Sequence, residues 1–223
     1  MIDVQTIIDR ARQASDYVGN SHVQDSEATS QLDGLWAQHY GDYTAAYPEL
    51  YRVEATVISD GTADYALPAD YFGTIGMDWE ESVGGRRTEL RRLQEHERNR
   101  FAGLTGTHHS THFRVIGGNL YLYPTPTSGQ RYIHIYIPVP TRLDAVSDQI
   151  DGLLGHERLF VIELAKFILM KCQKYDGRFE VEIRELVAKL KQEAAMRQLV
   201  EPQTCEDPLS PWDRYDWAWQ TRY

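Results

Sequence analysis

The chain has few cysteines and no long apolar run. Its 223 residues include only two cysteines, Cys172 and Cys205. Two cysteines cannot form a disulfide framework and cannot alone supply a structural zinc site, which excludes both classes of protein. No segment approaches the roughly 18 apolar residues of a membrane span, and the N-terminus lacks the apolar core of a signal peptide. We therefore expect a globular chain without membrane contact that stays in the cytoplasm or leaves the cell by lysis.

Basic side chains are also scarce. The chain has 23 Lys and Arg against 33 Asp and Glu, a formal net charge of −10. Residues 1–83 hold 3 basic and 15 acidic side chains, whereas residues 84–114 hold 7 basic and 3 acidic ones. Because Lys and Arg supply most of the affinity of proteins for DNA phosphates, we expect contact with nucleic acid to be weak or repulsive. The sequence predicts an acidic molecule with one basic patch.

The basic patch consists of five arginines for which two interpretations are open. Its members are Arg86, Arg87, Arg91, Arg92 and Arg98. The interpretation that we favour is a solvated loop and short helix whose arginines pair with neighbouring acids. The other is a surface that contacts a partner.

Apolar residues at spacings of three and four predict helices over residues 3–18, 26–51, 153–175 and 178–199. We expect Pro48 to kink the second helix or end it early. His39 lies on the apolar face of that helix without a second ligand one turn away, so we interpret it as a buried histidine with a satisfied ring nitrogen. Residues 159–172 are apolar on nearly all sides, which predicts an almost wholly buried helix.

Between residues 53 and 140 the apolar period changes to two, which predicts a β region. Gly117 and Gly118 permit the positive φ angles of a tight hairpin turn. Two helices before this region and two after it predict an α+β fold, a helical bundle with an antiparallel β insertion. Residues 1–200 then form a single domain.

The last 23 residues follow a different pattern. Residues 201–211 are rich in proline and lack a period, which predicts an extended linker. Tryptophan and tyrosine are favoured anchors of protein interfaces. We therefore favour an extended arm that inserts into a neighbouring subunit or a partner, and the alternative is a tail that folds back on its own core. The aromatic residues of the arm are Trp212, Tyr215, Trp217, Trp219 and Tyr223.

Enzyme motifs are also missing. The chain lacks a dinucleotide-binding glycine motif, a phosphate-binding loop, a zinc-protease helix and a hydrolase elbow. The histidines at 108, 109 and 112 lack a carboxylate or thiolate at a supporting spacing, so we expect them to be exposed in a loop. The acidic pairs Glu80 with Glu81 and Glu95 with Glu97 are expected on solvated faces. We therefore predict no catalytic residue, no metal site and no cofactor. A small hydrolase or a ligand-binding α+β module with an unrecognised site remains the alternative.

Three segments carry a family resemblance through their order in the chain. Residues 65–72 read YALPADYF, and residues 115–126 read VIGGNLYLYPTP and lead through Gly129 into the strand at 132–138. The buried helix at 159–172 follows. This order resembles the head-to-tail adaptor (connector) proteins of tailed bacteriophages, which sit directly under the portal.

The resemblance implies a helical bundle with a β domain, assembled as a homo-oligomeric, dodecameric ring in the virion neck after synthesis in the host cytoplasm. It implies the portal protein and a tail or nozzle protein as partners, with genomic DNA passing only transiently through the channel. A net charge of −10 suits a conduit for DNA, because like charges repel. On this basis we hypothesise that the aromatic arm contacts the portal or a neighbouring adaptor. The basic patch would then be a second contact, with the next tail component.

Overall fold

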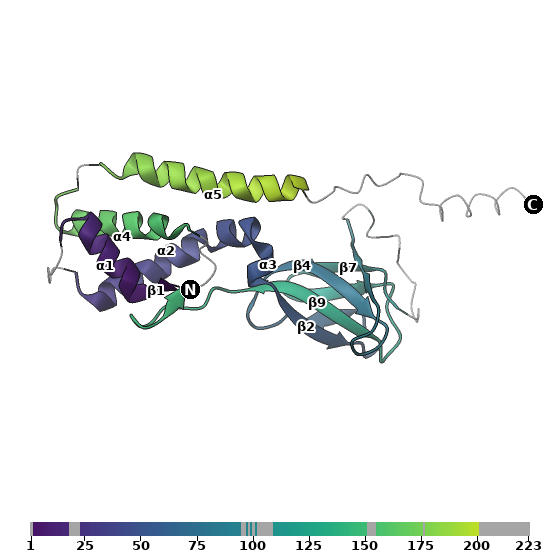
Figure 1. Cartoon of the computed structure of the whole chain (residues 1–223). Helices are drawn as coiled ribbons and strands as arrows, with labels where there is room; N and C mark the ends of the chain where they lie inside the picture. The colour runs from purple at the N-terminus through teal and green to yellow at the C-terminus, as the bar shows by residue number, and fades with distance from the viewer. Residues whose placement is uncertain are drawn as a thin grey trace, which may run out of the picture.

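The structure is a computed structural model that describes residues 2–17, 23–94, 97, 99, 101, 109–150, 155–175 and 177–200, the last four by their backbone alone. Over these residues the fold is α+β, as the sequence predicts. Figure 1 shows the helices at one end of an elongated molecule and most of the strands at the other. We call these ends the helical part and the β part.

The described residues form five helices. Their bounds are α1 (Val4–Ala14), α2 (Asp25–Ala46), α3 (Pro48–Tyr51), α4 (Glu157–Lys171) and α5 (Glu180–Val200). Pro48 separates α2 from α3, because proline lacks the N–H that would continue a helix but fits the first turn of a new one. Helix α4 ends earlier than the predicted residue 175, because Gln173 has a left-handed φ of 56° two residues after its last turn.

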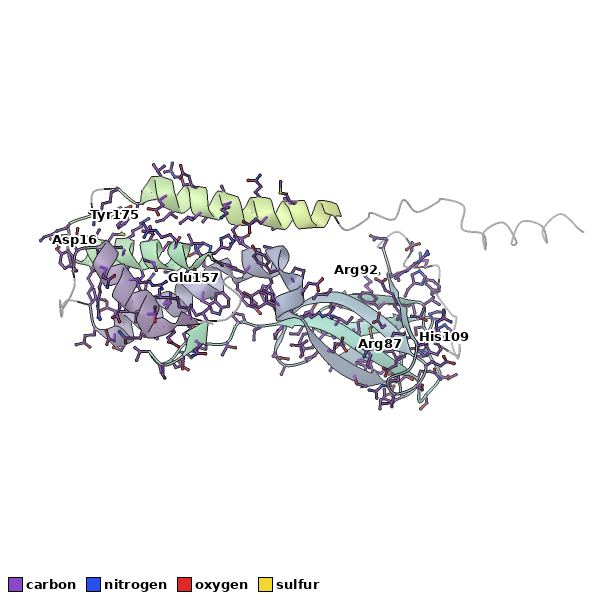
Figure 2. All side chains as sticks on the ribbon, in the orientation of Figure 1. Asp16, Arg87, Arg92, His109, Glu157 and Tyr175 are labelled. Atoms are coloured by element: carbon purple, nitrogen blue, oxygen red, sulfur yellow. The ribbon has the colours of Figure 1, made fainter. Side chains whose placement is uncertain are left out.

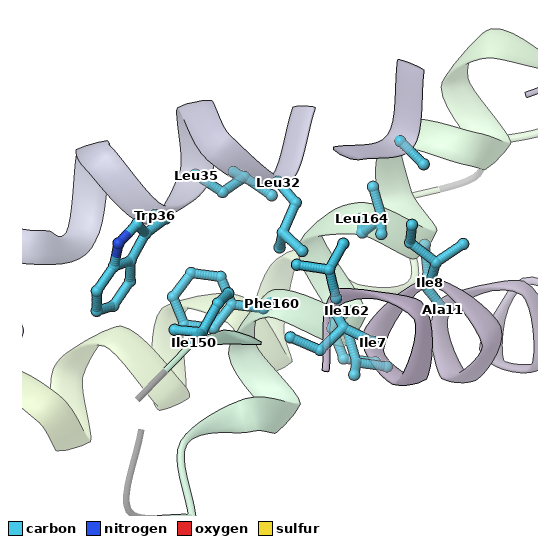
Figure 3. Packing of buried hydrophobic residues seen from close by; sticks show 14 of the residues in the cluster. Ile7, Ile8, Ala11, Leu32, Leu35, Trp36, Ile150, Phe160, Ile162 and Leu164 are labelled. Atoms are coloured by element: carbon cyan, nitrogen blue, oxygen red, sulfur yellow. The ribbon is translucent and has the colours of Figure 1, made fainter. Parts of the chain in front are cut away.

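Helices α1, α2 and α4 share one hydrophobic core, shown in Figure 3. Ile7 of α1, Leu32 of α2 and Phe160 and Leu164 of α4 are fully buried in it. Helix α4 buries residues on nearly all of its sides, which confirms the prediction of a buried helix. Its main exception is Met170, which is 56% exposed. Helix α5 closes this core by packing against α2 and α4.

The β part consists of two four-stranded sheets. The strands are β2 (Val53–Ile58), β3 (Asp64–Ala66), β4 (Tyr71–Glu80), β5 (Arg87–Glu89), β6 (Arg91–Arg92), β7 (His112–Ile116), β8 (Asn119–Tyr123) and β9 (Arg131–Pro138). One sheet has the order β2-β9-β4-β5 and the other has the order β3-β8-β7-β6. The ladders are antiparallel, apart from β6 with β7. Gly117 and Gly118, with φ angles of 58° and 95°, form the predicted hairpin turn between β7 and β8.

The two sheets pack face to face over a second core. Met77 of β4 and Tyr132 of β9 contact Phe113 of β7 and Leu122 of β8 within it, and all four side chains are buried. Leu90 lies between β5 and β6, where the chain passes from one sheet to the other. This crossing places residues 87–89 in one sheet and residues 91–92 of the same extended segment in the other.

The β part is fastened to the helical part where the chain returns after β9. The Tyr40 hydroxyl of α2 donates a hydrogen bond to the carbonyl oxygen of Pro138 (2.8 Å), and Asp33 of α2 accepts one from the backbone N–H of Leu143 (2.9 Å). The chain then forms strand β10 (Gln149–Ile150), which pairs with strand β1 (Ile2–Asp3). This two-residue pairing could not be predicted, because strands of two residues are too short to show a period.

Candidate contact surfaces

The basic patch lies on the β part, and its described members follow a strand. The prediction of a loop and short helix is wrong for Arg87, Arg91 and Arg92, which lie on β5 and β6, whereas Arg86 lies in the turn before β5. Buried Leu90 and Leu93 anchor this segment, and their backbone N–H groups bond to Met77 (2.7 Å) and Phe113 (2.8 Å). Figure 2 places Arg87 and Arg92 in the β part, away from the helices. Arg98 lies outside the described residues.

The arginines of the patch differ in their partners. Arg87 pairs with Glu54 (3.0 Å) and with Glu80 (3.4 Å), as our favoured interpretation of neighbouring acids requires. Arg86, Arg91 and Arg92 are exposed, and across the described part of the chain no carboxylate forms an ion pair with them. Among the described members of the patch, these three arginines are therefore available to a partner.

The prediction that Glu80 lies on a solvated face is wrong. We expected a solvated carboxylate, but its side chain is 2% exposed. The register of β4 places Glu80 opposite both Arg131 and Arg87, and Glu80 pairs with each of them. The hydrogen bond from Arg131 is the main reason that the pKa of Glu80 lies below its usual range. Glu80 also accepts a hydrogen bond from the N–H of Gly84 (3.3 Å), so it braces the turn between β4 and β5.

The histidine cluster is also built into the β part, contrary to the prediction of an exposed loop. The ring of His109 stacks on Trp79 with centroids 4.3 Å apart, and His112 begins β7. Ser110 is buried between them, and its hydroxyl donates to the Pro124 carbonyl (2.6 Å). His108 lies outside the described residues. Among the residues that the structure describes, no group of three or more potential ligands could hold a metal ion.

Two histidines of the helical part tie helices together. His39 Nε2 lies 3.0 Å from the Glu163 carboxylate, and both side chains are largely buried, which confirms the interpretation of His39. His156 is buried at the start of α4, and its Nε2 lies 3.0 Å from Glu193 of α5. The Tyr47 hydroxyl also bonds to Glu193. This second cluster could not be predicted from the sequence, since its members are spread over three segments of the chain.

A groove with both apolar and polar lining opens where the helical part meets the β part, and we call it the junction groove. Its volume is about 230 Å³. Buried side chains form its floor, among them Trp36 and Tyr40 of α2 and Ile150 of β10. Two apolar side chains on its rim are exposed, Leu50 (54%) and Val139 (47%).

The aromatic arm, Trp212, Tyr215, Trp217, Trp219 and Tyr223, lies outside the described residues, as do Cys205 and the acidic residue Glu95. None of the helices that the structure describes is both long and apolar enough to cross a membrane.

The comparison with known families agrees with the resemblance noted above. The model of the family described as SU10 adaptor protein matches residues 2–214, which is nearly the whole chain. A search of curated proteins gave no match. The matched region includes the helical part, the β part and the first aromatic residue of the arm, Trp212. The chain therefore belongs to the SU10 adaptor protein family, a family of phage head-to-tail adaptors with a structural role in the virion.

Proposed function

We propose that the protein forms a homo-oligomeric, dodecameric ring in the virion neck, which joins the portal to the tail and continues the DNA channel. The family match across residues 2–214 is the observation that carries this proposal. Residues 1–200 act as one adaptor domain, a helical bundle with its β insertion, and residues 201–223 act as an extended arm. Assembly takes place in the host cytoplasm, without a cofactor and without a catalytic step.

The charge of the chain supports a conduit over a DNA clamp. Each copy carries a net charge of −10, so a ring of many copies surrounds DNA with an excess of negative charge. Like charges repel phosphates within about a Debye length, roughly 8 Å at physiological salt. A channel of this kind lets DNA pass without holding it.

Two surfaces are proposed as contacts. The aromatic side chains of the arm, Trp212, Tyr215, Trp217, Trp219 and Tyr223, contact the portal or a neighbouring adaptor. The basic patch, through its exposed arginines Arg86, Arg91 and Arg92, contacts an acidic surface of the next tail component. Many identical contacts in a ring add up to a stable attachment even where each is weak.

The proposal is tested by mass measurement and electron microscopy of the protein, alone and mixed with the portal protein of the same phage. Full-length protein is compared with protein truncated after Val200. We expect the full-length chain to form a closed ring stacked coaxially on the portal, and we expect truncation to remove it. A ring that survives truncation would keep the adaptor role but exclude the arm as its anchor. A persistent monomer that ignores the portal would contradict the proposed function.

A further inference from the structure

The junction groove is a preformed pocket of the size of one large side chain. Its volume of about 230 Å³ is smaller than the roughly 300–1,000 Å³ of sites for small molecules. The connection that forms one wall is held at both ends, by the hydrogen bond from Tyr40 to Pro138 and by the one from Leu143 to Asp33. The N–H of Val139 also bonds to the Asp70 carbonyl (2.7 Å). Because this wall is already ordered, filling the groove costs little additional conformational entropy.

The lining of the groove suits an aromatic occupant with a polar edge. Trp36, Tyr40 and Tyr51 supply aromatic surface, and Pro138 supplies an apolar wall. Thr141 and Gln149 add polar groups at the same groove, which can bond to an indole N–H or a phenol hydroxyl. Aromatic rings gain about 0.5–1.5 kcal/mol beyond burial when they pack edge-to-face or offset against one another.

Exposed apolar side chains surround the groove. Leu50 and Val139 are on its rim, and Val53, at the start of β2, is 41% exposed. Phe72, 48% exposed at the start of β4, packs on the groove residue Tyr40 with ring centroids 5.3 Å apart. Clusters of exposed apolar residues on a soluble protein mark interaction sites.

The chain itself provides a matching segment. Residues 212–219 contain three tryptophans and one tyrosine, and 12 positions separate Trp212 from Val200, the last residue of α5. An extended chain of that length spans up to about 40 Å. The C-terminal half of α5 lies beside the end of α2, because Glu193 bonds to Tyr47. The arm therefore departs from the end of the helical part at which the groove opens.

The arrangement of the helices favours a groove on another copy. Figure 1 shows α5 on one side of α2, and the strand pair β1–β10 with the connection from β9 on the opposite side. The groove is formed on that opposite side, between α2 and the connection. An arm that fills its own groove has to pass around its own helical part, whereas an arm that fills the groove of a second copy does not.

We infer that residues 212–219 of one copy place an aromatic side chain in the junction groove of a neighbouring copy and so link the subunits of the ring. This inference rests on the proposed ring, and it selects the neighbouring adaptor as the partner of the arm. Exchange of identical segments between copies is a low-cost route to oligomers. The basic patch, at a different part of the molecule, is left free for the tail.

Photocrosslinking in the full-length protein tests this link. A benzophenone amino acid replaces Val139 on the groove rim, and in a matched control it replaces Ile58, which is 62% exposed at the other end of the same sheet. Copies labelled with ¹⁵N and unlabelled copies are mixed and assembled with the portal. Mass spectrometry then identifies the crosslinked peptides and shows whether they join two copies.

We expect crosslinks from position 139 to residues 212–219, joining labelled with unlabelled copies, and at least about tenfold fewer from position 58. Crosslinks confined to single copies would overturn the inference, because the arm would then fill its own groove. Rings on the portal without crosslinks to 212–219 would also overturn it while leaving the proposed function intact. Failure to form rings with wild-type protein would instead contradict the proposed function.

A pair of charge substitutions tests the same link without the benzophenone probe. In the full-length chain, Val139→Glu places a charge on the groove rim, and Val83→Glu does so at the 82% exposed tip of the β4–β5 turn. We expect V139E to raise the protein concentration needed for ring assembly by about tenfold or more, as loss of an interface anchor does. V83E is expected to assemble as the wild type does. Equal assembly of both variants, each folded by circular dichroism, would overturn the inference.

Discussion

His39 on α2 and Glu163 on α4 lie 3.0 Å apart although 124 residues separate them in the chain. The whole β part is inserted between these two positions. The contact therefore joins a helix that precedes the β part to one that follows it, next to the shared core. The helical part is complete only when both ends of the chain have come together.

The core that adjoins this contact should be sensitive to loss of volume. Phe160 is fully buried and packs on Tyr43, Trp36 and His39, with centroid distances between 5.8 and 6.1 Å. We expect Phe160→Ala to lower the free energy of unfolding by roughly 3–5 kcal/mol, measured by urea denaturation. Met170→Ala, on the exposed side of the same helix, should change it by less than about 0.5 kcal/mol. Similar effects of both substitutions would contradict the described packing.

The stability of the protein should decrease in mild acid because of His134. Burial lowers the pKa of His134 from 6.5 to about 4, and its Nε2 lies 3.0 Å from the Thr74 hydroxyl. The unfolded chain binds a proton at this residue between these two pH values and the folded chain does not. The contribution of His134 to stability is therefore present above pH 6.5 and is lost as the pH falls towards 4, by up to about 3 kcal/mol.

Unfolding free energies measured at several pH values between 4 and 7 check this expectation. The variant His134→Asn should show a smaller loss of stability over that interval than the wild type. Thr88→Asn, at an exposed position of β5, changes no titrating group, so it serves as the control and should keep the wild-type dependence. An unchanged pH dependence in H134N would show that His134 is not the group responsible.

Glu80 and its neighbour Glu81 provide a matched pair of substitutions. Glu80→Gln removes the charge that Arg131 and Arg87 share, and leaves two guanidinium groups near a neutral amide. We expect a lower melting temperature and faster proteolysis at the turn between β4 and β5. Glu81→Gln, which is exposed, should change neither measurement. Equal melting temperatures for the two variants would count against the bracing role of Glu80.

The contact role of the basic patch can be separated from stability. Arg91→Glu combined with Arg92→Glu reverses two exposed charges that form no ion pair with a described carboxylate. We expect the variant to fold normally and to assemble on the portal, but to lose attachment of the next tail component in a reconstitution assay. Arg184→Glu, a substitution at an exposed position of α5 in the helical part, should leave attachment intact. Normal attachment of the double variant would exclude the patch as a contact.

The position of α5 depends on one carboxylate. Glu193 bonds to Tyr47 and to His156, and the bond from Tyr47 is the main reason that its pKa lies below its usual range. We expect Glu193→Gln to raise amide hydrogen exchange in the C-terminal half of α5 by about tenfold. Glu185→Gln, on the exposed side of α5, is the control. Unchanged exchange in E193Q would show that apolar packing alone holds the helix.

The sequence predicted the elements whose signal is local. The apolar residues around α4, the glycines of the β7–β8 turn and the satisfied ring of His39 each follow from a short stretch of chain, and the structure confirms them. Glu80 and His109 were misplaced for the opposite reason. Their burial depends on Arg131 and Trp79, which lie on strands that only the register of the sheets brings alongside.

The candidate surfaces also differ in whether a local stretch of sequence predicts them. The basic patch is visible in the sequence as a local excess of arginine, although the passage of its strand between two sheets is not. The junction groove could not be predicted at all, since residues from α2, α3, β10 and the connection after β9 form it. A cavity made by two distant stretches of the chain leaves no pattern in either of them.

The insertion of the β part also has a mechanical consequence. The chain enters the β part after α3 and returns through the connection at 138–143, so two segments of the backbone link the two ends of the molecule. The hydrogen bond that Tyr40 donates to Pro138 and the one that Asp33 accepts from Leu143 hold this connection against α2. A force on the β part is shared between these two segments, and a torque about the long axis of the molecule must distort both. A virion neck built from such subunits would transmit a rotation of the tail to the head with little deformation within each subunit.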